Sequence, residues 1–75
     1  MTLAELVKSR RAERGLSLSQ VAAVAGVSKQ YVSEIEKGRI VNLSVLVALG
    51  LAKALSVPEM TVIDAIRESA RGGGV

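Results

Sequence analysis

Four hydrogen-bonding side chains share the outward face of one short predicted helix: Lys29, Gln30, Ser33 and Glu34. An ammonium group donates to guanine O6 or N7, a primary amide pairs with adenine N6 and N7, and a carboxylate accepts from cytosine N4. Because the first turns of a helix in a DNA major groove lie nearest the bases, this arrangement suits the reading of a base sequence. Simple surface exposure is the other explanation for each residue.

The segments that must position this helix flank Gly26. The apolar residues of each segment fall on one helical face: Val21, Ala22 and Ala25 before the glycine, and Val32 and Ile35 after it. Gly26 stands where the first segment must end and the chain must turn, which favours a residue that tolerates positive φ. Ala22 is small enough for a close helix crossing, and Ser28 suits the N-cap of the second helix. The pattern predicts a helix-turn-helix.

The stretch from Arg10 to Gly38, RRAERGLSLSQVAAVAGVSKQYVSEIEKG, resembles the lambda-repressor-like (Cro/C1, or Xre) DNA-binding family. The segment AKALSV at residues 52–57 resembles the end of that family's fourth helix, and the likeness covers roughly residues 3–66. It implies an all-α domain of five helices that binds double-stranded DNA, with helices two and three as the helix-turn-helix. The positions that match the family's base readers are Lys29, Gln30 and Glu34.

The resemblance also implies an ion pair between Arg11 in the first helix and Glu36 in the third. Glu36 lies beside the apolar Ile35 on the inner edge of its helix, where a carboxylate without a partner would be costly. Pairing with Glu36 would make Arg11 unavailable to DNA.

Contacts with the DNA backbone are expected around the recognition residues, at Ser17, Ser19, Ser28, Tyr31, Lys37 and Arg39. The family usually contacts sugar and phosphate just after its third helix, and the amide groups at the start of helix two offer a second anion site. Charge favours this half of the chain: seven basic and three acidic residues lie between Lys8 and Arg39, and three of each follow. Leu18 departs from the family, in which many members have a phosphate-binding glutamine.

Capping residues set the expected helix boundaries. Capping boxes at Thr2 and Ser17 open the first two helices, and Asn42 is the expected N-cap of the fourth. We therefore expect five helices, over about residues 3–14, 18–25, 29–37, 43–55 and 58–69. They form one domain, residues 1–69, and the glycine-rich residues 70–75 are expected to be a disordered tail.

The fourth expected helix is apolar on every face, which a small core cannot cover completely. Its core stripe is expected at Val45, Ala48, Leu49, Ala52 and Leu55. The other apolar residues of this helix and the next predict a homodimer interface made of Leu46, Val47, Gly50, Leu51, Met60 and Val62. Scattered surface aliphatic residues are the simpler explanation, and a different protein partner is a third.

The 75 residues include no cysteine and no histidine, which removes common metal ligands and the usual general base. We therefore expect no enzymatic activity, no metal and no cofactor. The apolar run Val45–Leu49 is far too short to span a membrane, and the N-terminus has no signal-peptide pattern. The expected location is cytoplasmic.

These features predict a sequence-specific regulator of transcription, and we expect a repressor that binds a two-fold-symmetric operator as a homodimer. One alternative is the antitoxin of a toxin–antitoxin pair, in which helix four also holds the toxin. A second is a protein-interaction adaptor that keeps the fold and has lost DNA binding. The basic residues Lys29, Lys37 and Arg39 argue against the adaptor.

Overall fold

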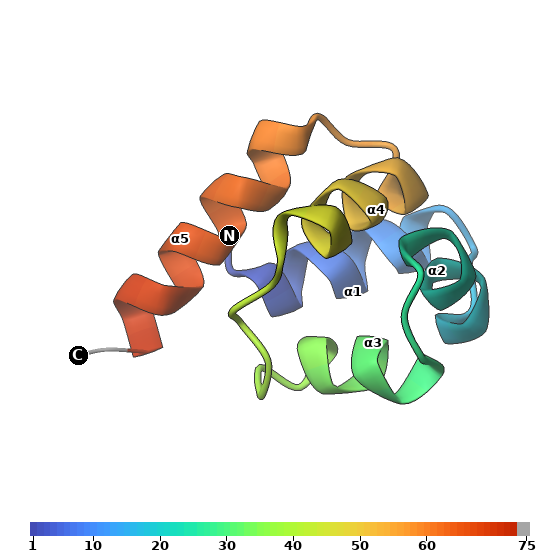
Figure 1. Cartoon of the computed structure of the whole chain (residues 1–75), viewed down its shortest axis with the longest axis horizontal. Coiled ribbons are helices and arrows are strands. Elements are labelled where there is room, and N and C mark those ends of the chain that lie inside the picture. Colours follow the sequence, from blue (N-terminus) through green and yellow to red (C-terminus); the bar gives the residue numbers. More distant parts are fainter. Residues whose placement is uncertain (74–75) are drawn as a thin grey trace.

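The computed structural model describes residues 1–73, which form five α-helices and no β-strand (Figure 1). The helices are α1 (Leu3–Glu13), α2 (Leu18–Ala25), α3 (Lys29–Glu36), α4 (Val45–Leu55) and α5 (Glu59–Gly73). α4 packs against α1, α2 and α5, whereas α3 packs mainly against α1 and α2. α3 therefore forms one edge of the molecule, and α5 lies on another side (Figure 1). This is the expected all-α, five-helix fold.

The first three helices begin at the predicted caps. The hydroxyl groups of Thr2 and Ser17 accept from the backbone amides of Glu5 and Gln20, at 3.3 and 3.0 Å, and both capping boxes are complete. The hydrogen bond from the Thr2 backbone amide, and to a smaller extent that from the Thr2 hydroxyl, lowers the pKa of the Glu5 carboxyl group. Gly26 ends α2 at φ +75°, a left-handed conformation that costs glycine little.

Every helix contributes to the core. Its largest fully buried side chains are Leu3, Val7, Val21, Val32, Ile35, Leu51, Leu55 and Val62. Gly50 lets α4 lie directly on the end of α2, because a Cβ atom at this position would stand 2.8 Å from the Ala25 Cα atom. The helix-turn-helix is thus supported from behind by α4 at backbone contact distance.

α4 differs from its prediction in its start and in its buried face. It begins at Val45 and not at Leu43, because Ser44 replaces Asn42 as the N-cap: the Ser44 hydroxyl accepts from the Val47 amide at 3.2 Å. Val45 was expected in the core but is 73% exposed, because the first turn of α4 extends beyond the core. The buried residues of this helix are Ala48, Leu51, Ala52, Ala54 and Leu55.

α5 continues past its predicted end near Ser69 to Gly73. The helix includes residues 70–73 of the expected tail, and residues 74–75 lie outside the described residues. A hydrogen-bonded contact with the start of the chain lies close to this end of α5.

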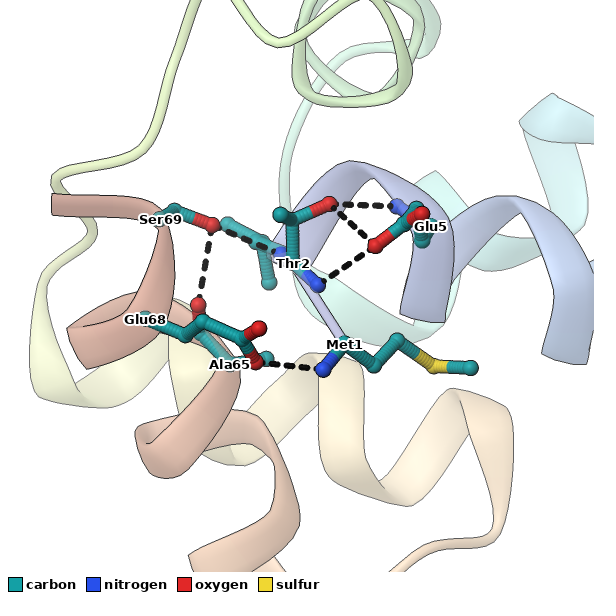
Figure 2. A network of polar contacts seen from close by, with 7 residues as sticks. Met1, Thr2, Glu5, Ala65, Glu68 and Ser69 are labelled. Carbon is teal, nitrogen blue, oxygen red and sulfur yellow. Dashed lines mark hydrogen bonds and ion pairs between the residues drawn. The ribbon is translucent and has the colours of Figure 1, made fainter. Parts of the chain in front are cut away.

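That contact joins the start of α1 to the last turns of α5 (Figure 2). The buried Ser69 hydroxyl accepts from the Leu3 amide at 2.7 Å and donates to the Ala65 carbonyl oxygen at 2.9 Å. The α-amino group of Met1 pairs with the neighbouring Glu68, and this hydrogen bond raises the pKa of the amine. These bonds join the last turns of α5 to the start of α1 at the border of the apolar core.

Candidate nucleic-acid interface

α3 presents one buried face and one exposed face. Val32 and Ile35 have no exposed surface, so the helix cannot rotate without moving two aliphatic side chains into water. Lys29 and Gln30, in its first turn, are exposed. Ser33 and Glu34 lie at the side of this face, because both are half-buried. The strongest candidates for base contacts are therefore Lys29 and Gln30.

The starts of α2 and α3 carry hydroxyl groups suited to anions. Ser17 and Ser28 cap these helices, and each hydroxyl oxygen accepts from a backbone amide at 3.0 Å. A hydroxyl that accepts in this way keeps its own hydrogen for donation. Ser19 is exposed in the first turn of α2. Together with the amide groups of the first helical turns, these donors match a phosphate group.

The chain leaves α3 through a Schellman turn at Gly38, whose φ is +77°. The Gly38 amide donates to the Ile35 carbonyl oxygen and the Arg39 amide to the Glu34 carbonyl oxygen, both at 3.0 Å. This turn brings Arg39 back beside α3, where its Nη1 atom lies 3.4 Å from Oε2 of Glu34. Lys37 and Arg39 are both exposed, so two positive charges stand at this end of α3.

The pairing of Glu34 with Arg39 is a feature that the sequence analysis missed. A glycine four residues after Glu34 was the available signal, because a Schellman turn folds the residue after the glycine back onto the last helical turn.

Tyr31 and Leu18 both pack partly against the core. The tyrosine ring therefore helps to attach the first turn of α3 to the core. The Leu18 side chain fills space at the position where many family members have glutamine, which leaves any phosphate contact there to the neighbouring serines and amide groups.

The predicted ion pair between Arg11 and Glu36 is present and joins α1 to α3. Arg11 Nε donates to Glu36 Oε2 at 2.6 Å, and Nη2 donates to Oε1 at 3.1 Å. Nη1 of the same guanidinium donates to the Leu16 carbonyl oxygen at 3.0 Å. The side chains are only 23% and 10% exposed, and the hydrogen bonds with Glu36 raise the pKa of Arg11. Arg11 thus serves the scaffold and is not free to bind DNA.

An apolar groove separates the first half of α4 from α5. It has a volume of about 260 Å³ and is lined by Leu43, Val45, Ala48, Leu49, Ile63 and Ile66. Leu46, 80% exposed, and the exposed Met60 also lie on these two helices. Exposed apolar side chains thus lie on both helices that border this groove.

The predicted dimer residues do not all lie at this surface. Leu46 and Met60 are exposed, but Leu51 and Val62 are buried in the chain's own core. Gly50 faces the Ala25 backbone, and Val47 packs partly against the core. The prediction was wrong for Leu51 because α4 buries the face that contains Leu51 and exposes the one that contains Val45. It was wrong for Val62 because this residue of α5 faces the core.

Within residues 1–73, no group of three or more acidic, histidine or cysteine side chains is placed to hold a metal ion. In this same part of the chain, no single helix is long and apolar enough to cross a membrane. α4 and α5 satisfy that length and composition only as a pair bent by 119°.

The fold and the exposed face of α3 define a lambda-repressor-like helix-turn-helix domain. A family model described as helix-turn-helix matches residues 7–60. The chain therefore belongs to the helix-turn-helix family.

Known relatives are regulators. The HTH-type transcriptional regulator SinR of Bacillus subtilis is 34% identical over 71 residues, which cover 95% of this chain but only 64% of SinR. The control protein C.SmaI of Serratia marcescens is 41% identical over 59 residues, which cover 77% of this chain and 70% of C.SmaI. The crystal structure of the clp gene regulator ClgR from C. glutamicum matches with a TM-score of 0.70 and 30% identity, over 89% of this chain and 86% of that chain. None of these names describes an enzyme, in agreement with the expectation from the sequence.

Alanine at Arg11 or at Glu36 is expected to destabilise the fold by about 1.5–3 kcal/mol, because each change leaves a largely buried charged group without its partner. A double-mutant cycle measured by urea unfolding should give a coupling energy above about 0.5 kcal/mol. The exposed pair Asp64–Arg67, with 3.9 Å between Oδ1 and Nη1, is the matched control and should show almost no coupling. A cycle without coupling between Arg11 and Glu36 would contradict the structural role of this ion pair.

Proposed function

We propose that this chain is a transcription regulator that binds double-stranded DNA through α3. One observation carries the proposal: buried residues fix α3 to the scaffold, while Lys29 and Gln30 stand exposed in its first turn. This helix lies in the half of the sequence with the excess of positive charge. A major groove admits one α-helix, and every base pair presents a distinct set of donors and acceptors there.

Lys29 and Gln30 have different partners in the proposed complex. Lys29 donates to guanine O6 or N7, and the Gln30 amide pairs with adenine N6 and N7. Ser33 and Glu34 reach bases from the side of the exposed face, where Glu34 accepts from cytosine N4.

Contacts with phosphate fix the position of α3 on the duplex. We assign these contacts to Ser17, Ser19, Ser28, Tyr31, Lys37 and Arg39. The support is the exposure of Ser19, Lys37 and Arg39, together with the capping hydroxyls at the starts of α2 and α3. Because phosphate contacts release counterions, the affinity should fall steeply as salt is added.

The proposed active form is a homodimer that represses transcription from a two-fold-symmetric operator in the cytoplasm. Its interface is the apolar groove between α4 and α5 together with Leu46 and Met60, in place of the set predicted from the sequence. A two-fold dimer presents the same surface from each copy and sets two copies of α3 about one helical turn of DNA apart. The same apolar surface supports the alternative of an antitoxin whose toxin partner covers it.

Lys29→Ala and Gln30→Ala are each expected to lower the affinity for an operator by about 1–3 kcal/mol and to leave binding to random-sequence duplex almost unchanged. Selection from a random duplex library supplies the operator, and fluorescence titration gives both affinities. Lys53→Ala, which removes an exposed lysine from α4, controls for the loss of one positive charge. Equal losses on both kinds of DNA would exclude base reading by Lys29 and Gln30.

Leu46→Glu is expected to convert the dimer into a monomer, because it places a charge in the apolar interface. Sedimentation equilibrium at tens of micromolar measures this change, and the melting temperature should lose its dependence on protein concentration. Val24→Glu is the control, since Val24 is an exposed aliphatic residue on α2, outside the proposed interface. A wild-type protein that is monomeric at these concentrations would reject the homodimer and favour a toxin or other partner.

A further inference from the structure

The two acidic residues of α3 have different partners. Glu36 is held by Arg11 on the inner side of the helix. Both carboxylate oxygens of Glu34 face Arg39 instead, with 3.4 and 3.5 Å from Nη1 to Oε2 and Oε1. Glu34 is 23% exposed and Arg39 is 67% exposed, so the arginine forms the outer part of the pair. The guanidinium group proposed to contact phosphate is therefore already next to a carboxylate.

We propose that Glu34 is a positioning residue that holds Arg39 in the DNA-free protein and weakens binding to DNA that offers Glu34 no hydrogen-bond donor. This inference rests on the proposed DNA-binding function and concerns the selectivity of the same site. It assigns Glu34 a role in rejecting DNA in addition to its proposed contact with a base.

When the protein binds DNA of arbitrary sequence, Arg39 must turn from the Glu34 carboxylate to a phosphate oxygen. This exchange of partners is unfavourable for Glu34. The carboxylate then stands beside a polyanion without its cation, which offsets part of the attraction between Arg39 and the phosphate. Glu34 therefore reduces the affinity that Arg39 contributes to sequence-independent binding.

On a site with a cytosine opposite Glu34, the same exchange costs less. The exocyclic N4 amino group donates a hydrogen bond to the carboxylate that Arg39 has left. Discrimination between bases at this position then comes from the penalty on other bases as well as from the bond to cytosine.

The Glu34–Arg39 pair is not needed to shape the turn. The turn is held by backbone bonds, from Gly38 to Ile35 and from Arg39 to Glu34, which side-chain changes leave in place. An ion pair at 3.4 Å whose arginine is 67% exposed adds little to stability. Variants at Glu34 and Arg39 should therefore keep the fold, which a thermal melt verifies, and DNA binding should report on the pair itself.

The test uses Glu34→Gln, Arg39→Ala, the double variant and the wild type. Each is titrated with a short random-sequence duplex over a range of salt concentrations. Glu34→Gln should bind about two- to fivefold more tightly than the wild type. The slope of log K against log salt should become steeper by up to about 1. Arg39→Ala should cost about two- to fivefold more affinity in the Glu34→Gln background than in the wild type.

Asp64→Asn is the matched control. It raises the net charge by the same amount, and it removes an exposed carboxylate that also has an arginine partner, but on α5. It should leave duplex binding unchanged. A gain from Glu34→Gln that persists equally in the Arg39→Ala background, or no gain at all, overturns the inference while the proposed function stands. A wild-type protein that does not bind duplex even at low salt overturns the proposed function itself.

Discussion

The bidentate pair between Arg11 and Glu36 fixes the direction of α3, which the burial of Val32 and Ile35 attaches to the core. α3 has eight residues, too few to be stable as an isolated helix, and only two of its side chains, Val32 and Ile35, are fully buried. A planar guanidinium bound through two nitrogens fixes direction as well as distance. The third nitrogen of Arg11 binds the Leu16 carbonyl oxygen, so the same side chain also holds the connection between α1 and α2.

α4 supports the helix-turn-helix by packing closely against α2. With glycine at position 50, the α4 backbone approaches the end of α2 more closely than a side chain would allow. The burial of Leu51 and Leu55 then anchors α4 in the core. The molecule therefore has two separate surfaces. One carries the exposed first turn of α3, and the other is the open apolar groove between α4 and α5.

Much of this arrangement could be predicted because its signals are local. Gly26 and the capping serines determine where α2 and α3 begin and end, and each lies within a few residues of the structure it controls. Arg11 and Glu36 are distant in sequence, and their pairing was predicted mainly from the family resemblance. The exposure of Lys29 and Gln30 follows from the helical period once Val32 is placed in the core.

The buried face of α4 could not be predicted from the same kind of signal. A helix that is apolar all round has several apolar stripes with helical spacing. The positions of the neighbouring helices determine which stripe is buried, and here it is the one that contains Leu51 and not the one that contains Val45. Ser44 and Asn42 are both good caps, so composition did not distinguish them. The bond between Ser69 and Leu3 has no local signal either, because these residues lie 66 positions apart in the sequence.

The central claim is that DNA binds at the exposed face of α3, and backbone amide NMR shifts test it most directly. Titration of the labelled protein with a random-sequence duplex at low salt should shift the amide signals of the first turns of α2 and α3 and of the turn at Lys37 to Arg39. The signals from the groove between α4 and α5 should change far less. Shifts confined to that groove, or no shifts at saturating duplex, would contradict the account.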